Sequence, residues 1–281
     1  MHCTQHQPIY LDHNATTPIA PEVREAMLPY LGEAFGNPSS GYPLGRRAKD
    51  ALEEARADVA RLLGCRPQEI VFTSGGSEAN NMALKGRVDF RRPGAFHLVT
   101  TAVEHPAILN PALYLGELGA TITVLPVDSR GRVDPDAVRR ALTPGTGLIS
   151  VMLANNETGA LQPVAEIAAV AAEHGVPVHT DAAQAVGKIP VDVDALGVAL
   201  LSVAGHKLYA PKGVGVLYIR EGLEITPLIH GARQESGRRA GTENVLLAVG
   251  LGAACRLAAE TLAAERRRVE GLRDELQERL F

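Results

Sequence analysis

The feature that most constrains this chain is an alternation of short, continuously apolar segments with longer segments of amphipathic, helical pattern. A strand that is apolar at every position belongs to a sheet covered on both faces. Helical segments between successive strands favour parallel pairing. We therefore predict an α/β domain with a mostly parallel central sheet and helices on both of its faces.

The pattern predicts strands over residues 70–73, 97–101, 121–126, 148–153, 178–180, 200–203 and 215–219. It predicts helices over residues 23–31, 46–63, 77–85, 107–118, 134–141 and 164–174. In the second of these helices apolar residues recur at three- and four-residue spacing, and Gly64 ends it. Ligand-binding residues of such sheets gather where strands end and loops begin, so we expect a functional site there.

The tail from Val245 to Phe281 contains no proline, keeps a helical pattern and becomes highly charged after Glu260. About 35 helical residues would span roughly 50 Å, which exceeds an ordinary globular helix. Two interpretations stay open: a helix packed on its own domain, or a connector to a second domain. We divide the chain into an N-terminal arm (1–15), a large domain (16–244) and a connector helix (245–281).

Composition excludes several classes of protein. Of the 281 residues, 46% are hydrophobic, which is too many for intrinsic disorder. The net charge of -4 argues against a nucleic-acid-binding surface. The chain has no run of about 18 uninterrupted apolar residues and no secretory signal, so we expect neither a membrane span nor export. Cys3, Cys65 and Cys255 lack metal-ligand spacing, so we expect no metal site and a reducing, cytoplasmic location.

Residues 73–78, with the sequence Thr-Ser-Gly-Gly-Ser-Glu, lie between a predicted strand and a predicted helix. Gly76 lets the backbone approach a ligand, the helix N-terminus offers N–H groups to an anion, and Ser77 adds a hydroxyl. These features indicate a phosphate site, although the segment is neither a Walker loop nor a dinucleotide fingerprint. A glycine turn without a ligand is the alternative interpretation.

Lys207 is one of five lysines and follows His206 in a glycine-containing turn at a strand end. A lysine that forms a Schiff base needs such a fixed, partly desolvated position. Asp181 ends another strand among small residues, where a carboxylate could hold the protonated pyridine nitrogen of pyridoxal 5'-phosphate (PLP). Gln184, one turn later, could reach the same ligand. The alternatives are a solvated charge at Lys207 and a helix cap at Asp181.

Two further strand ends carry polar clusters. His105 follows Glu104 just after the 97–101 strand, where an imidazole could stack on an aromatic ring or move protons. Asn156 belongs to the run Asn-Asn-Glu-Thr-Gly at 155–159. Polar residues after a buried strand need partners, which a polar ligand would supply, but an ordinary loop turn is an equal alternative.

The motifs occur in a specific order along the chain: Asp-His-Asn-Ala-Thr-Thr-Pro at 12–18, Gly-Asn-Pro-Ser-Ser at 36–40, Thr-Ser-Gly-Gly-Ser-Glu at 73–78, Glu-His at 104–105, Ala-Asn-Asn-Glu-Thr-Gly at 154–159, Asp-Ala-Ala-Gln at 181–184, Gly-His-Lys at 205–207 and Ala-Gly-Thr-Glu-Asn at 240–244. In this order they closely resemble the cysteine desulfurase and selenocysteine lyase family. That family belongs to the class V aminotransferases of PLP fold type I. The resemblance runs from about Ile9 to the end and implies PLP as the cofactor.

The resemblance implies a role for each matching residue around the cofactor ring. Lys207 would hold PLP covalently, and His105 would stack on the ring as an acid–base group. Asp181 would bind the pyridine nitrogen and Gln184 the phenolic oxygen. Asn156 would lie beside the cofactor oxygen and the substrate.

The resemblance also implies how the phosphate is held. Gly76, Ser77 and His206 match the phosphate cup of the family. Thr242 matches a threonine that reaches the phosphate of the neighbouring subunit, so a homodimer is expected. The implied reaction removes sulfur from L-cysteine (or selenium from L-selenocysteine). It leaves L-alanine and an enzyme-bound persulfide, which a sulfur-acceptor protein would receive for Fe-S clusters or other thio-cofactors.

Two departures from the family pattern matter. Ala204 stands where members often have a serine whose hydroxyl binds phosphate, and selenocysteine-lyase-like relatives also tend to be apolar there. Members also continue into a small C-terminal domain that carries a nucleophilic cysteine and an arginine for the substrate carboxylate. None of the three cysteines matches that nucleophile. We therefore expect a fragment of a longer gene product or a naturally short protein. The alternative functions are a selenocysteine lyase or another class V PLP lyase, and a non-catalytic PLP-binding or dimerisation module.

Overall fold

The computed structural model describes residues 9–281, so Cys3 and part of the predicted N-terminal arm lie outside the described residues. A seven-stranded sheet forms the centre of the molecule, with the order β1-β7-β6-β5-β4-β2-β3. Its strands are β1 (Ile70–Thr73), β2 (His97–Thr101), β3 (Thr121–Leu125), β4 (Thr146–Ser150), β5 (Val178–Asp181), β6 (Leu200–Ala204) and β7 (Gly215–Ile219). The predicted strands are therefore all present.

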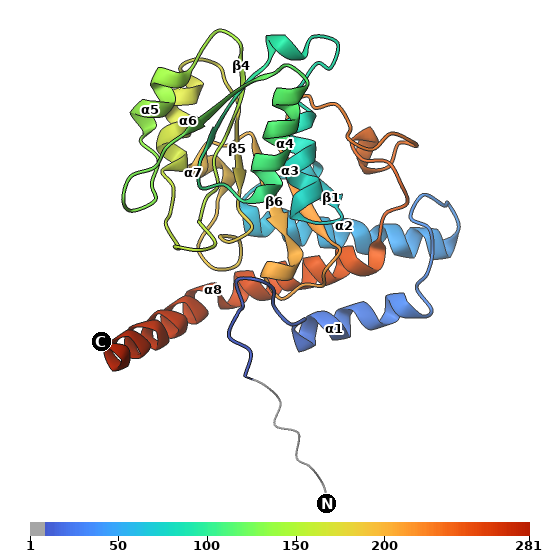
Figure 1. The fold of residues 1–281 in the computed structure, drawn as a ribbon. Coiled ribbons are helices and arrows are strands. Elements are labelled where there is room, and N and C mark those ends of the chain that lie inside the picture. The colour runs from blue at the N-terminus through green and yellow to red at the C-terminus, as the bar shows by residue number, and fades with distance from the viewer. Residues whose placement is uncertain (1–8) are drawn as a thin grey trace, which may run out of the picture.

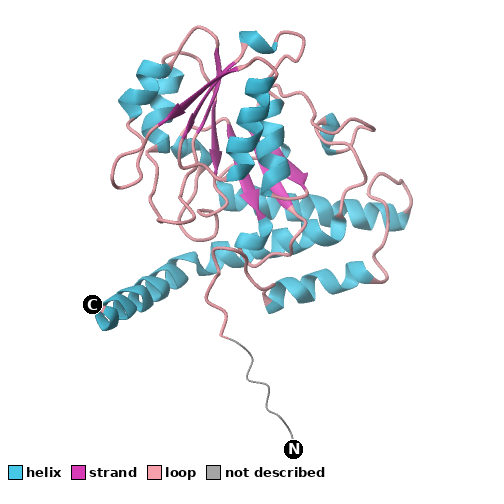
Figure 2. Ribbon diagram, in the orientation of Figure 1, coloured by secondary structure: helices cyan, strands magenta, loops and turns pink. Residues whose placement is uncertain are grey.

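The sheet is mostly parallel, as the sequence pattern predicts. Strands β3, β2, β4, β5 and β6 pair in parallel, whereas β7 runs antiparallel to both β6 and β1. The helices are α1 (Pro21–Met27), α2 (Pro43–Leu63), α3 (Gly76–Lys85), α4 (Pro106–Glu117), α5 (Pro135–Ala141), α6 (Val164–Ala172), α7 (Val193–Leu196) and α8 (Val245–Leu280). Figure 2 shows the strands between these helices.

Each continuously apolar strand serves two hydrophobic cores, because successive side chains point to opposite faces of a sheet. In β2, Leu98 packs in the core under α3 and α4, whereas Val99 packs in the core under α2, α5 and α6. Leu148 and Ile149 of β4 divide in the same way. Helices on both faces therefore explain why β2 and β4 bury apolar residues on both sides of the sheet.

Helix α8 is a single helix of 36 residues that packs against α1 and α2 and then projects from the domain (Figure 1). Every residue from Ala263 onward is exposed. By length and composition alone, α8 could cross a membrane, because its most apolar 18-residue window has a mean hydropathy of 1.6. This window does not form an uninterrupted apolar run, because it contains Arg256. A core helix of a soluble protein meets the same criterion, and 39% of that window is buried in this fold.

Several element boundaries differ from the sequence prediction, and among the C-terminal ends those of α1 and β4 differ most. The first helix ends at Met27, and a 3-10 turn covers Leu28–Leu31. Pro29 has no N–H to donate to an α-helical hydrogen bond, which explains the change. Strand β4 ends at Ser150 rather than residue 153, although Val151 N–H still donates to the His179 oxygen at 3.1 Å.

Candidate active site

A cavity of about 690 Å³ opens where β1, β2, β4, β5 and β6 end. Five strands deliver side chains to it because β1 and the parallel strands point the same way through the sheet. Its lining includes the predicted site residues Gly76, Ser77, His105, Asn156, Asp181, Gln184, His206 and Lys207. A cavity of this size suits a small organic ligand.

Lys207 ends the 3-10 turn Gly205–Lys207 that directly follows β6. Its Nζ donates to the backbone oxygens of Asn14 and, at 2.7 Å, of Ala15. Burial lowers the pKa of this ammonium group, against the opposing charges of the Asp12 and Asp181 carboxylates. Lys207 is therefore fixed and partly desolvated rather than freely solvated.

The segment that supplies these oxygens is bonded to the lysine turn. Thr17 donates its N–H and its hydroxyl to the backbone oxygen of His206, at 2.9 and 3.0 Å. Nδ1 of His206 lies 3.0 Å from Oγ1 of Thr16. Burial, together with the charges of Lys207 and Lys212, lowers the pKa of His206 below its usual value, so its imidazole is neutral at pH 7.

Asp181 is the last residue of β5, and its two carboxylate oxygens have different partners. Oδ2 accepts from Nδ2 of Asn80 at 2.7 Å, and Oδ1 accepts from the N–H of Ala183 at 3.0 Å. The second bond caps a turn rather than a helix, because residues 183–188 form turns. Oδ1 of Asn80 is buried without a hydrogen-bond partner among residues 9–281.

Asn80 was not among the predicted site residues. It lies on the buried side of α3, is 1% exposed and lines the cavity. A polar amide on an otherwise apolar helix face, one turn after Ser77, is the only signal in the sequence that could have indicated it. Its contact with Asp181 spans 101 residues of chain and depends on the fold.

The N-terminus of α3 forms an open cup beside the end of β6. Gly75 has φ of 151°, a conformation that favours glycine. A Cβ on Gly76 would lie 3.2 Å from Cβ of Ala204. The Glu78 carboxylate accepts from the N–H of Ser74 at 2.7 Å. The first N–H groups of an α-helix have no partner within the helix, so those of α3 are suited to an anion.

His105 is the N-cap of α4, where its Nδ1 accepts from the N–H of Ala107 at 3.1 Å. In the neutral imidazole this bond leaves the proton on Nε2. Glu104 is buried and accepts from the hydroxyl of Thr101 at 2.7 Å and from the N–H of Met152 at 2.9 Å. The Glu104 carboxyl therefore joins the ends of β2 and β4 directly before His105.

The two asparagines of the polar cluster at 155–159 have different positions. Asn155 builds the turn, because its Oδ1 accepts from the N–H groups of Glu157 and Thr158 at 3.0 and 2.9 Å. Asn156 instead lines the cavity, and its Nδ2 donates to Oε1 of Glu157 at 2.7 Å. Asn155 therefore holds the loop, and the loop places Asn156 at the cavity.

Gln184 lies at the cavity beside a second lysine. Its Nε2 donates to the backbone oxygen of Asn14 at 3.0 Å, and its Oε1 accepts from Nζ of Lys188. Burial, together with the charge of Lys207, lowers the pKa of Lys188 to about 8. Lys188 was not predicted, although it directly follows Gly187 in the turn over residues 183–188.

Thr242 is the predicted site residue that the fold does not bring to this cavity. It is exposed on the segment between the 3-10 turn Glu235–Gly237 and α8. Its side chain is therefore free to contact another molecule rather than the cavity of its own chain.

The cysteines within the described residues are not activated nucleophiles. Burial raises the pKa of the Cys65 thiol to about 12, and burial raises that of Cys255 as well. Both are free thiols, with Cys255 fully inside the α8 packing. A thiolate is the reactive form, so neither serves as the nucleophile at neutral pH.

The residues present fit PLP. Asp181 offers a carboxylate to a protonated ring nitrogen, and Lys207 offers an amine. Gly76 leaves a cradle that a Cβ would narrow, beside a helix N-terminus suited to a phosphate. The buried, unpartnered Oδ1 of Asn80 is a polar atom that a ligand in the cavity can satisfy.

Comparison with known proteins identifies the family to which this fold and site belong. The family model of Aminotransferase class-V matches residues 9–280, so the chain belongs to that class. "Cysteine desulfurase IscS" of Dictyoglomus turgidum is 52% identical over 266 residues, which cover 95% of this chain and 68% of the relative. Within the class, the chain is a member of the cysteine desulfurase family.

Solved structures show the same relationship. A "NIFS-LIKE PROTEIN" superposes with a TM-score of 0.94 at 39% identity, covering 98% of this chain and 76% of that one. "SspA in complex with cysteine" superposes with a TM-score of 0.86 at 43% identity, covering 88% of this chain and 72% of that one. The predicted fold type and family are therefore confirmed.

Proposed function

We propose that this chain carries the PLP site of an enzyme that converts L-cysteine and a protein thiol into L-alanine and a protein persulfide. The observation that carries the proposal is the position of Lys207, held and partly desolvated in one cavity with Asp181. Family membership supports the reaction, and the solved relative SspA binds cysteine.

The residues around the ring have distinct tasks in this proposal. Bound PLP supplies an electron sink that makes the bonds of the substrate amino acid labile. Asp181, oriented by Asn80, keeps a proton on the pyridine nitrogen. Lys207 would hold the cofactor covalently, and the amide of Gln184 would bind its phenolic oxygen. Asn156, which lines the same cavity, would contact that oxygen and the substrate.

His105 is the proposed acid–base group of the reaction. Because Nδ1 is occupied by the N–H of Ala107, Nε2 is the nitrogen that exchanges protons with the reacting amino acid. Its N-cap position on α4 keeps the imidazole ring at the cavity, in the loop that follows β2. The same ring would stack on the cofactor.

The phosphate would be bound by Gly76, Ser77 and His206 of one chain and by Thr242 of a second chain. Thr242 is exposed and lies outside its own cavity, which supports a homodimer. Leu31 and Phe35 are 68% and 74% exposed, and they offer apolar surface for such an interface. We place this dimer in the cytoplasm, where a thiol nucleophile stays reduced.

We also propose that α8 connects the large domain to a segment that supplies the nucleophilic cysteine and a cation for the substrate carboxylate. The exposed side chains Val269, Leu272 and Leu276 lie at three- and four-residue spacing along its projecting half, as in a helix face that packs against another segment. The persulfide would then pass to an acceptor protein for Fe-S clusters or other thio-cofactors.

Alanine production from cysteine under reductant tests the proposal. We expect a form extended beyond Phe281 to make alanine and a persulfide, and the 281-residue chain to bind PLP with little turnover. Selenocysteine is the second substrate to compare, because selenocysteine-lyase-like relatives also tend to be apolar at the position of Ala204. Selenocysteine-only turnover would favour a selenocysteine lyase, and PLP uptake without turnover by either form would favour the non-catalytic module.

A further inference from the structure

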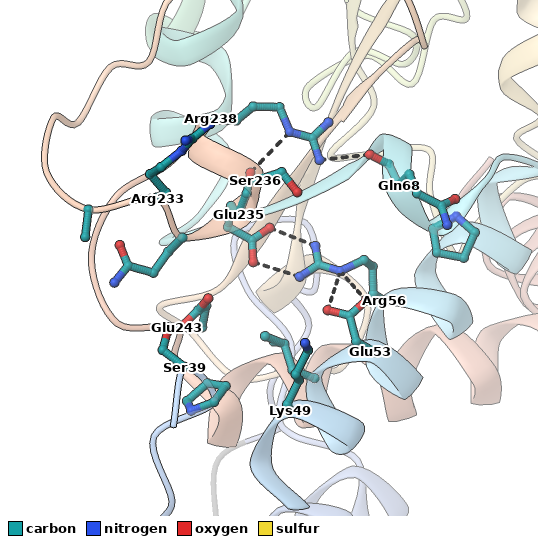
Figure 3. A pocket seen from close by; sticks show the side chains of 15 residues that line it. Ser39, Lys49, Glu53, Arg56, Gln68, Arg233, Glu235, Ser236, Arg238 and Glu243 are labelled. Atoms are coloured by element: carbon teal, nitrogen blue, oxygen red, sulfur yellow. Dashed lines mark hydrogen bonds and ion pairs between the residues drawn. The ribbon is translucent and has the colours of Figure 1, made fainter. Parts of the chain in front are cut away.

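A second cavity of about 590 Å³ lies away from the candidate active site, between α2 and the segment 232–243 (Figure 3). Arg56 of α2 and Glu235 of that segment face each other there in a bidentate ion pair, with N–O distances of 2.7 and 2.8 Å. Arg56 is 7% exposed and Glu235 is 6% exposed. The pair is therefore buried although it joins residues 179 positions apart.

Two atoms of the ion pair also bind the edge strand of the sheet. Oε2 of Glu235 accepts from the N–H of Phe72 at 3.0 Å, and Nη1 of Arg56 donates to the oxygen of Ile70 at 2.9 Å. Strand β1 is an edge strand, so Glu235 takes the place of a missing neighbour. The carboxylate thus fixes the segment to both α2 and β1.

The backbone at this point is strained. Glu235 has φ of 46° and Ser236 has φ of 58°, in the left-handed region that residues with a side chain rarely adopt. Such residues persist only where surrounding contacts determine their conformation. The ion pair supplies those contacts, because its hydrogen bonds are directional and satisfy both charges.

The geometry set at Glu235 reaches Thr242 through two further contacts. The N–H of Gly241 donates to Oε1 of Gln234 at 3.0 Å, which closes the loop directly before Thr242. Arg239 donates to both carboxylate oxygens of Glu78, at 2.8 and 3.2 Å. The loop is thereby bonded to the N-terminal turn of α3, which also forms the phosphate cup.

We propose that Glu235, held by Arg56, is a positioning residue that sets Thr242 for the cofactor phosphate of a second subunit. The inference rests on the proposed homodimeric PLP enzyme. A buried ion pair gives little net stability compared with apolar residues, but its directional bonds can select one geometry. That role fits a strained loop whose end must reach another molecule.

The double variant Arg56→Met/Glu235→Ala tests this role without leaving an unpaired buried charge. We expect it to fold and dimerise but to bind PLP about tenfold more weakly, like Thr242→Ala, which loses one hydrogen bond to a charged group. Adding Thr242→Ala to the double variant should weaken binding no further. The control is Glu53→Gln, which removes the exposed carboxylate 3.2 Å from Nε of the same arginine and leaves the loop in place.

Mixed dimers separate a positioning role from general damage. One subunit carries Lys207→Ala with an intact loop, and the other carries Lys207 with the Arg56→Met/Glu235→Ala pair. The loop acts across the interface, so we expect the remaining Lys207 to bind PLP with wild-type affinity, read from absorbance and from the borohydride-reduced adduct. A merely structural role would leave this affinity as weak as in the double-variant homodimer, and that result would overturn the proposal.

The wild-type chain distinguishes a failure of the proposed function from a failure of the positioning role. If it takes up no PLP or stays monomeric, the proposed function is wrong and this inference with it. If it binds PLP as a dimer and the double variant binds equally tightly, only the positioning role is wrong. Should the double variant not fold, Glu235→Gln keeps the size of the side chain but weakens the contact with Arg56, and it should show a smaller loss that the same mixed dimer restores.

Discussion

Burial shifts the pKa of two side chains beside the active site. Burial raises the pKa of Glu104 to about 8, with a further rise from the nearby Asp181 charge. Burial and the charge of Lys207 lower the pKa of Lys188 to about 8. Glu104 is therefore a neutral acid at pH 7, which suits a carboxyl that joins two strand ends in an apolar core.

Glu104→Gln tests this protonation state through the pH dependence of stability. Between its ordinary pKa of 4.5 and about 8, Glu104 loses its proton in the unfolded chain but keeps it in the folded one. The free energy of unfolding of the wild type should therefore fall as the pH rises through this window. Glutamine does not titrate and keeps both accepted hydrogen bonds. Urea unfolding of the cofactor-free proteins should show that the free energy of unfolding of the variant, relative to that of the wild type, is higher at pH 8 than at pH 5. An equal difference at the two pH values would contradict a neutral Glu104.

Ala204→Ser tests the phosphate cup. Ala204 ends β6 and is 4% exposed, and its Cβ borders the space beside Gly76. A hydroxyl there gains one hydrogen bond to the phosphate, so PLP should bind about tenfold more tightly. The dissociation constant from an absorbance titration measures the change. A weaker or unchanged affinity would mean that the phosphate lies elsewhere.

At the level of elements, α8 and α2 pack at a close crossing that requires glycine. A Cβ on Gly252 would lie 2.6 Å from the backbone Cα of Ala55. Backbone cannot move aside as the end of a flexible side chain can, so the two helices would have to separate. By contrast, a Cβ on Gly271, on the exposed part of the same helix, would meet no atom within 4 Å.

These two glycines form a matched pair of variants. Gly252→Ala should lower the free energy of unfolding by about 1–3 kcal/mol, because overpacking outweighs the gain in helix propensity. Gly271→Ala should raise the free energy of unfolding by at most about 1 kcal/mol. It should leave this free energy unchanged if the exposed part of α8 frays before the domain unfolds. Thermal or urea unfolding measures both. A stabilising Gly252→Ala would show that the helices do not cross as closely as described.

The elements also show what sequence patterns can and cannot predict. Apolar runs located every strand, because a sheet covered on both faces leaves a strong local signal. The end of β4 and the break at Met27 were placed wrongly, since ladder pairing and proline geometry set them. Asn80 and Arg56 escaped prediction because their partners lie more than a hundred residues away in sequence.

At the scale of the whole molecule, one site is built from distant parts of the chain. The backbone oxygens of Asn14 and Ala15 bind Lys207 across more than 190 residues. The motif at 12–18 contributed to the family resemblance, but no role followed from it until the fold brought it to the lysine. The motifs indicate which strand ends carry site residues, whereas the contacts between those residues follow only from the three-dimensional structure.

The most direct test of the account is to locate the lysine that holds PLP. Purified protein is saturated with PLP, reduced with borohydride and mapped by peptide mass spectrometry, with Lys207→Ala and Lys188→Ala in parallel. Lys188 is the sharp competitor, because it lies 3.5 Å from the Asn14 side chain and its pKa is lowered to about 8. The account predicts a modified peptide that contains Lys207, an unmodified Lys207→Ala protein and a modified Lys188→Ala protein. Modification of Lys188, or an adduct that survives in Lys207→Ala, would contradict it.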